Sequence, residues 1–145
     1  MSVEQVARDI VSNMNNKEKL KAMVTADAMA SGGVLPQPIP VMEALKVMDG
    51  LTTAFPDLKF DIQKVTVNGN KATVNAMWSG TNTGAVDLGM PGMPSIPATG
   101  KKVSVKDTYI VTVEGDKVSH MQVDSPADGG IPAALAQLGF KLPGM

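Results

Sequence analysis

The chain contains no cysteine among its 145 residues. Disulfide bonds, thiolate metal ligands and a cysteine nucleophile are therefore excluded. Histidine occurs once, at His120, and a single histidine with scattered acids does not make a transition-metal site. The sequence also lacks a Gly-x-Ser-x-Gly elbow, a phosphate-binding loop and a dinucleotide fingerprint. It therefore predicts a protein with no metal and no cofactor.

Aromatic residues and strong charge are also scarce. Aromatics make up 3% of the chain, and the only arginine is Arg8. The 13 basic and 14 acidic residues leave a net charge of −1, and neither sign forms a long run. Nucleic-acid binding needs a basic stripe or a set of stacking aromatics. The composition therefore argues against nucleic acid as a partner.

Long apolar runs are missing as well. No run approaches the roughly 20 residues of a membrane span, and Met1 to Gln5 lack the basic and apolar regions of a signal peptide. We expect a cytoplasmic protein without membrane association. A chain of this length suits one domain over residues 1–145 and can bury about two thirds of its unfolded surface.

The first third of the chain shows helical periodicity. Apolar residues spaced three and four apart predict helices over Val3–Asn15, Lys17–Val24 and Val41–Ala54. Ser2, with Gln5 three residues later, forms a plausible capping box for the first helix. The segment Ser31–Pro40 holds two glycines and three prolines and is expected to be a loop.

After Pro56 the pattern alternates with a period of two, which indicates strands. A slip near Gln63–Lys64 predicts a bulge, and Asn68–Gly69 predicts a hairpin. Three apolar strand faces follow: Leu58, Phe60 and Ile62; Ala72, Val74, Ala76 and Trp78; Val103, Val105, Asp107, Tyr109, Val111 and Val113. Helices followed by consecutive antiparallel strands predict an α+β fold with the helices packed on one face of a sheet.

Two segments depart from these patterns. Gly84–Gly100 contains four glycines and three prolines, so a long loop is expected. Its apolar residues predict a lid over a cavity, with Met90 or Met93 facing inward. Ser125–Pro132 separates the last strand from a terminal helix expected over Ile131–Leu138.

Asp107 interrupts the apolar face of its strand, between Val105 and Tyr109. A carboxylate in an apolar environment needs a partner or a raised pKa, because desolvation disfavours its charged form. It is therefore a candidate acid or hydrogen-bond acceptor in a pocket. The alternative is a local twist that takes it to solvent, or a pairing with a lysine.

The last strand carries a second polar constellation. Alternation places Val118, His120, Gln122 and Asp124 on one face, opposite Ser119, Met121 and Val123. If the first face is concave, an imidazole and a carboxylate line one cavity. In the alternative, that face is the solvent side of the strand, and Met121 and Val123 lie inside.

Two aromatic residues are candidates for the pocket wall. Trp78 is expected to be a core aromatic or a pocket wall. Tyr109 lies on the same strand face as Asp107 and has a phenol that can donate to a developing oxyanion. The alternative for Tyr109 is half-buried packing.

Three short motifs carry a resemblance to a known family. They are Ala54-Phe55-Pro56-Asp57-Leu58, Pro97-Ala98-Thr99-Gly100-Lys101 and Gln137-Leu138-Gly139, in that order and spacing. Together they resemble the small SnoaL-like polyketide cyclases of the nuclear-transport-factor-2-like superfamily, over roughly Val41 to Leu142. Gly80-Thr81 matches a further motif of that family. The resemblance implies a cone, in which a curved antiparallel sheet and N-terminal helices enclose a pocket.

The resemblance also implies a function. It predicts a cofactor-free cyclase or isomerase that removes a proton next to a carbonyl of a small apolar compound. Asp124 best matches the family's acid/base aspartate, with Asp128 as the alternative, while His120, Asp107 and Tyr109 would polarise or orient. The substrate would contact Trp78, Gln122, Met90 and Met93. The competing hypothesis is a non-catalytic ligand-binding or dimerisation domain on the same scaffold.

We predict a homodimer joined through the outer face of the sheet. The resemblance implies this association, and Met77 and Ile110 place apolar groups opposite Trp78 and Tyr109. Analytical ultracentrifugation at micromolar concentration should give twice the mass of one chain. A monomer under those conditions would contradict the prediction.

Overall fold

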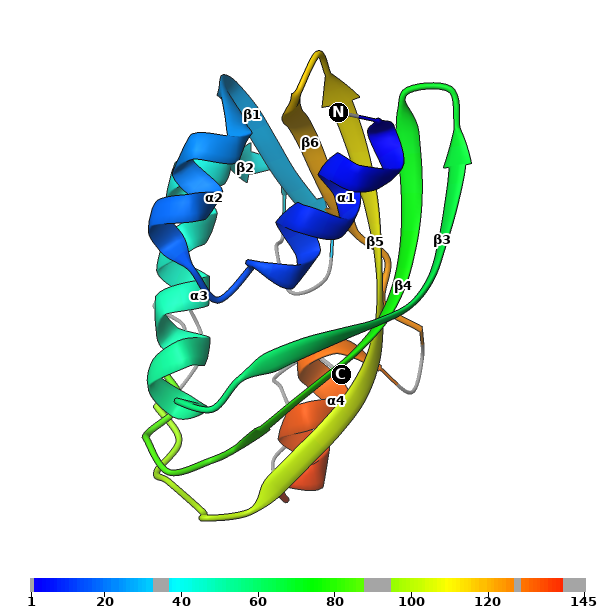
Figure 1. Cartoon of the computed structure of the whole chain (residues 1–145). Helices are drawn as coiled ribbons and strands as arrows, with labels where there is room; N and C mark the ends of the chain where they lie inside the picture. Colours follow the sequence, from blue (N-terminus) through cyan, green and yellow to red (C-terminus); the bar gives the residue numbers. More distant parts are fainter. Residues whose placement is uncertain (1, 33–36, 88–94, 127–128, 140–145) are drawn as a thin grey trace.

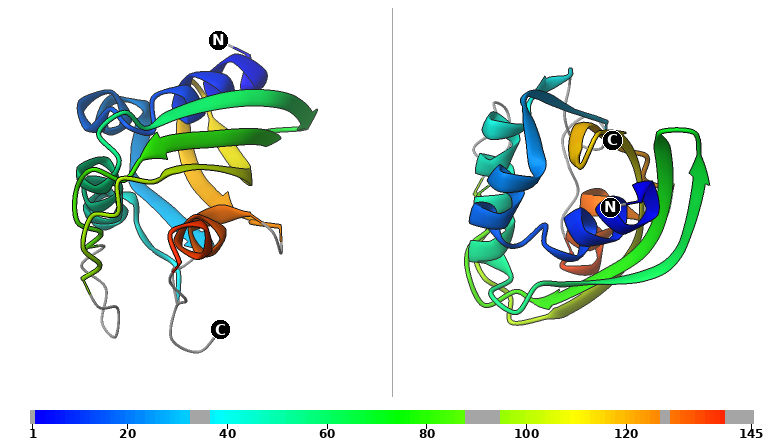
Figure 2. Two further views of the ribbon diagram at one scale, coloured as in Figure 1. Left: turned by 90° about the horizontal axis from the view of Figure 1, so that it is seen from below. Right: turned by 45° about the horizontal axis from the view of Figure 1, so that its top comes forward.

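The computed structural model describes residues 2–32, 37–87, 95–126 and 129–139. The elements in these ranges are α1 (Val3–Ser12), α2 (Lys17–Met23), β1 (Val24–Gly32), β2 (Ile39–Pro40), α3 (Val41–Ala54), β3 (Lys59–Asn68), β4 (Lys71–Thr81), β5 (Lys102–Glu114), β6 (Lys117–Val123) and α4 (Gly130–Gln137). A strongly curved sheet wraps around α1, and α2 and α3 lie along the open side (Figure 1; Figure 2). The predicted α+β cone is confirmed.

The described strands form one sheet in the order β2-β1-β6-β5-β4-β3. All neighbouring pairs are antiparallel except β1 and β6, which are parallel. The sequence did not predict β1 or β2, and the expected loop Ser31–Pro40 is wrong at both of its ends. Alanine is a weak strand former, so β1 gives little local signal. Burial of Ala28 and Ala30 and pairing with β6 determine this strand instead.

The three predicted N-terminal helices are present. α3 has the expected bounds, whereas α1 ends at Ser12, three residues before the expected Asn15. Half of the capping box forms, because Ser2 Oγ accepts the Gln5 N–H at 3.1 Å while the Gln5 side chain donates to Asp9. The second helix ends one residue early, at Met23, where β1 begins.

The predicted strand pairing is confirmed through the middle of the chain. The β3–β4 hairpin turns at Gly69, whose φ of 65° is the left-handed conformation that glycine adopts without strain. The register of this pair shifts between Ile62 and Lys64, where the bulge was predicted. The expected apolar faces of β4 and β5 are buried along their length.

Two apolar clusters fill the cone. The larger one joins α1 to the concave face of the sheet, with Ile10, Val74 and Val111 at its centre. The smaller cluster lies at the other end of the cone and includes Leu135 of α4. In it, the rings of Trp78 and Phe55 pack edge to face, with their centroids 5.9 Å apart. The long strands β4 and β5 contribute side chains to both clusters. A side chain in the middle of either strand therefore lies between the two clusters.

The Phe55-Pro56-Asp57 motif joins the end of α3 to the end of β4. Asp57 Oδ1 accepts the Thr81 backbone N–H at 2.6 Å, and Oδ2 accepts the Thr81 hydroxyl at 2.9 Å. These bonds lower the pKa of Asp57. A Cβ at Gly80 would lie 2.7 Å from Phe55 Cβ, so the Gly-Thr motif needs a glycine at this close approach.

Asn82 connects three segments from a fully buried position. Its side-chain oxygen accepts the backbone N–H and the hydroxyl of Thr99, both at 2.8 Å. Its side-chain nitrogen donates to the carbonyls of Ala54 and Gly84 at 3.3 and 2.8 Å. The end of α3, the end of β4 and the approach to β5 are therefore held together by one amide group.

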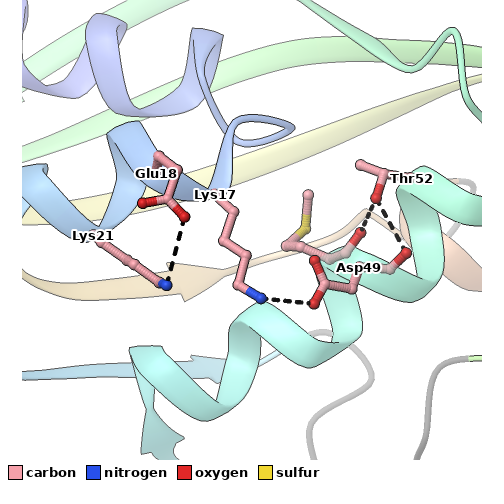
Figure 3. Close-up of polar contacts among 6 residues, drawn as sticks. Lys17, Glu18, Lys21, Asp49 and Thr52 are labelled. Atoms are coloured by element: carbon pink, nitrogen blue, oxygen red, sulfur yellow. Dashed lines mark hydrogen bonds and ion pairs between the residues drawn. The ribbon is translucent and has the colours of Figure 1, made fainter.

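Surface ion pairs lie on the wall formed by α2 and α3. Lys17 at the start of α2 contacts Asp49 on α3 at 3.1 Å, and Lys21 contacts Glu18 at 3.7 Å (Figure 3). Thr52 Oγ1 donates back to the carbonyls of Met48 and Asp49. These charges are solvent-exposed, so each pair contributes at most about 1 kcal/mol. Apolar packing, rather than these pairs, is what stabilises the wall.

The two described ends of the expected Gly84–Gly100 loop are anchored. Val86 and Ile96 exchange backbone hydrogen bonds of 2.7 and 2.8 Å, and both side chains are buried in the smaller cluster. The predicted inward-facing residues Met90 and Met93 lie outside the described residues.

We predict that Asn82→Ala lowers the free energy of unfolding by about 2–4 kcal/mol, because it leaves the Gly84 carbonyl and the Thr99 groups without their Asn82 partner and removes one of two donors to the Ala54 carbonyl. Asn75→Ala is the matched control, since Asn75 is half-buried and makes one bond, to Thr108 Oγ1. Urea unfolding should show a clearly smaller loss for the control. Equal losses would contradict the assigned role of Asn82.

Candidate functional site

A cavity of about 120 Å³ lies between the helices and the concave face of the sheet. Its wall is almost wholly apolar, formed by residues such as Met14 of α1, Leu45 and Met48 of α3, and Met121 and Val123 of β6. The side-chain polar groups of the wall gather on β4, β5 and the segment after β6. They belong to Trp78, Asp107, Tyr109 and Ser125.

Asp107 lies on the concave face because it follows the two-residue alternation of β5. Its backbone partner on β4 is Ala76, whose small side chain leaves room beside the carboxylate. On the other side, Ser125 follows β6 and reaches the same carboxylate. Asp107 is only 5% exposed. The alternative of a twist to solvent is therefore wrong, and no described lysine forms an ion pair with Asp107.

Three donors converge on the Asp107 carboxylate. Oδ1 accepts the Ser125 hydroxyl at 2.7 Å and the Thr108 backbone N–H at 3.0 Å. Oδ2 accepts the Tyr109 hydroxyl at 3.3 Å, and the Trp78 side chain lies near enough to lower the pKa of the carboxyl. The bonds to Oδ1 are the shorter ones, and the Tyr109 bond to Oδ2 is long and weak.

Burial raises the pKa of Asp107, because the apolar surroundings penalise its charged form. The hydrogen bonds from Ser125, Thr108 and Tyr109 and the nearby Trp78 side chain act in the opposite direction but do not cancel the effect of burial. The pKa of Tyr109 is raised well above its usual value, first by burial and then by the nearby Asp107 charge. Tyr109 is therefore a neutral hydroxyl donor at ordinary pH.

The segment between β6 and α4 completes the site. Gly130, the first residue of α4, has a φ of 72°, and a Cβ there would collide with Ser125 and lie 3.7 Å from Asp107 Oδ2. The start of a helix carries a partial positive charge that favours a nearby carboxylate. Sequence reasoning missed Ser125 and Gly130. The only signal was the unusual Ser125–Pro132 segment itself.

The polar face predicted for β6 does not line the cavity. The β5–β6 register shifts between the pairs Val113–Val118 and Thr112–His120, so Ser119 is an extra, bulged residue. The bulge resets the alternation and turns His120, Gln122 and Asp124 away from the concave face. The cavity receives Val118, Met121 and Val123 instead.

The side chains of that outer face have other environments. His120 Nε2 lies 2.8 Å from Ser31 Oγ on β1, and it is half-buried. Asp124 and Gln122 are exposed. The alternative acid, Asp128, lies outside the described residues. Of the three predicted catalytic residues, the structure places only Asp107 at the cavity, together with the predicted wall residues Trp78 and Tyr109.

In the described part of the chain, no three metal-ligating side chains of His, Cys, Asp or Glu lie close enough to hold an ion. No described helix is both long and apolar enough to cross a membrane.

Comparison with known proteins identifies the family. The family model for SnoaL-like polyketide cyclases matches residues 3–123. The chain therefore belongs to the SnoaL-like polyketide cyclase family. The match includes the N-terminal helices, which the sequence motifs did not cover. No curated protein sequence matches the chain.

Solved structures share the fold at low sequence identity. AclR from Streptomyces galilaeus, provisionally assigned as a hydroxylase, has a TM-score of 0.74 at 18% identity, covering 99% of this chain and 83% of AclR. IdmH from Streptomyces antibioticus, provisionally assigned as a polyketide cyclase, has a TM-score of 0.73 at 18% identity, covering 97% and 100%. A protein of ketosteroid isomerase-like fold from Catenulispora acidiphila has a TM-score of 0.67 at 16% identity, covering 93% and 92%.

We predict that Asp107 titrates above the usual value of about 3.9 and Asp57 below it. Carboxyl-detected NMR on wild-type protein, with each resonance assigned by the matching Asp→Asn variant, measures both in one titration. Because the folded-state pKa of Asp107 is raised, its ionisation destabilises the folded state. That cost appears as pH rises from about 4 through the folded-state pKa. An Asp107 value at or below that of Asp57 would contradict the prediction.

Proposed function

We propose that this protein catalyses cofactor-free proton abstraction next to the carbonyl of a small, neutral, apolar compound. The observation that carries the proposal is the Asp107 carboxylate, buried in an apolar cavity beside a neutral phenol. Membership of the SnoaL-like polyketide cyclase family supports chemistry of the cyclase or isomerase type. Ketosteroid isomerase performs proton abstraction with a comparable pair of groups, an Asp base and a Tyr in its oxyanion hole.

Asp107 is the proposed base. A raised pKa makes a carboxylate a stronger base, and a pKa nearer the working pH favours proton transfer in both directions. The substrate C–H bond breaks, its proton passes to Oδ2, and the electron pair becomes an enolate. In a cyclisation the enolate carbon then attacks a second carbonyl of the same molecule. The resulting alkoxide takes the proton back from Asp107.

Ser125 and Thr108 are the proposed positioning groups for that transfer. They hold Oδ1 with bonds of 2.7 and 3.0 Å, which fixes the plane of the carboxylate. Oδ2 is held by the longer Tyr109 bond. Proton transfer through Oδ2 therefore requires the phenol to move from the carboxylate to the substrate oxygen. There it would donate to the developing enolate, as an oxyanion stabiliser does.

The cavity restricts the substrate by charge and by size. None of the described residues that line it is Lys, Arg or His, so an anionic substrate would face the Asp107 charge without compensation. An apolar cavity of roughly 150 Å³ holds benzene, and this one measures about 120 Å³. A compound the size of a five-membered ring is therefore the proposed scale, with Trp78 as one wall and the flexible methionines adjusting the fit.

His120, Gln122 and Asp124 have no part in this mechanism, because they lie on the outer face of the sheet. The roles of Asp128, Met90 and Met93 remain predictions, and so does the homodimer.

We predict that the protein accelerates deuterium exchange of the α-protons of cyclopentanone in D₂O, measured by NMR. Asp107→Asn should lower kcat/KM by about 10²–10⁴-fold, because it removes the base. Tyr109→Phe should lower it by about 10²-fold, because it removes the hydroxyl donor for the enolate.

Asp124→Asn distinguishes the two candidate carboxylates. On the present assignment it retains the wild-type rate, whereas the family match predicts its loss. Asp61→Asn, at an exposed position of β3, controls for the change in net charge. Exchange that is lost in the Asp124 variant and kept in the Asp107 variant would refute the assignment of the base.

A further inference from the structure

In the part of the chain that the structure describes, no full positive charge lies beside the Asp107 carboxylate. The cavity wall contains no cationic side chain among the described residues. Burial is the largest influence on the pKa of Asp107, and hydrogen bonds come next. Its titratable neighbour at the cavity is Tyr109, which is neutral when Asp107 ionises. The start of α4 supplies only a partial positive charge. An ionised Asp107 therefore leaves the cavity one unit negative.

Most of the hydrogen-bonding capacity of the carboxylate is already used. A carboxylate offers about four lone-pair sites, and three donors occupy sites on Asp107, from Ser125, Thr108 and Tyr109. A primary ammonium ion brings three N–H donors that would need acceptors in a wall with few of them. A cation without N–H groups balances the charge and needs no hydrogen bond.

Aromatic rings line the same cavity as the carboxylate. The described aromatic residues that line it are Trp78, Tyr109 and Phe60. The rings of Phe60 and Tyr109 pack edge to face, with their centroids 6.4 Å apart. Aromatic rings near an alkylated ammonium attract it through the ring quadrupole. Its alkyl groups, meanwhile, fit an apolar wall that includes Met14, Met48 and Met121.

We propose that the cavity is a binding site for a compact, fully alkylated ammonium ion, with Asp107 as the counter-charge. Its volume of about 120 Å³ limits the ligand to a small head group. The site does not depend on turnover. A bound cation would occupy the position of the proposed substrate and inhibit exchange.

Three probes with the same number of non-hydrogen atoms separate charge from shape. Tetramethylammonium and tert-butylammonium are isomeric cations, without and with N–H donors, and tert-butanol is neutral. Binding is followed by NMR on the ¹³C-labelled methionine methyl groups, where Met48 and Met121 should report the cavity. Tetramethylammonium should bind about tenfold or more tightly than either of the others, the equivalent of ~1.4 kcal/mol.

Asp107→Asn should reduce tetramethylammonium affinity to that of tert-butanol, and Asp61→Asn, an exposed acid of the same kind, should leave it unchanged. The proposal is overturned if tert-butanol or tert-butylammonium binds as well as tetramethylammonium to the wild-type protein, if no probe perturbs the cavity methyl groups, or if Asp107→Asn retains the preference. The wild-type comparison stands even if that variant fails to fold. If tetramethylammonium does not bind but the protein still accelerates ketone exchange, only the ammonium site is refuted. Cation binding without exchange refutes only the proposed catalysis.

Discussion

The Asp107 carboxylate lies in an apolar cavity and keeps its position because donors from two parts of the chain converge on it. β5 supplies the acid, the Thr108 amide and the Tyr109 hydroxyl, the segment after β6 supplies Ser125, and Ala76 of β4 leaves room beside the carboxylate. A buried charge left without such partners would be strongly destabilising. The close approach of β4, β5 and the start of α4 is therefore a condition for having this acid in the cavity at all.

The family motifs lie away from the carboxylate and perform a different task. Asp57 ties the end of α3 to the end of β4, and Asn82 joins both to the approach to β5. These contacts hold the helical wall against the curved sheet, so they determine that a cavity exists. The residues that reveal the family are therefore scaffold residues, and they carry little information about which carboxylate faces the cavity.

Sequence reasoning recovered what depends on local pattern. The bounds of α3, the bulge near Gln63 and the buried faces of β4 and β5 follow from periodicity and turn residues. It singled out Asp107 because one acid interrupts an apolar face. It missed β1, whose alanines become a strand only through tertiary pairing, and it left open which face of the last strand is concave, because a bulge at Ser119 leaves no local signature. Ser125 was invisible, since nothing in the sequence shows that it meets Asp107.

The bulge at Ser119 has an evolutionary consequence. Because Val118 is opposite Val113 and His120 is opposite Thr112, deletion of Ser119 would restore strict alternation with His120 and Gln122 still outward and Met121 and Val123 still inward. A one-residue slip of β6 that paired Ser119 with Thr112 would instead turn His120 and Gln122 inward, and it would exchange an apolar lining for a polar one without altering any side chain of β4 or β5 beside Asp107. Relatives built on the same backbone can in this way reach different substrates through strand register, a route that comparison of residues at aligned positions would overlook.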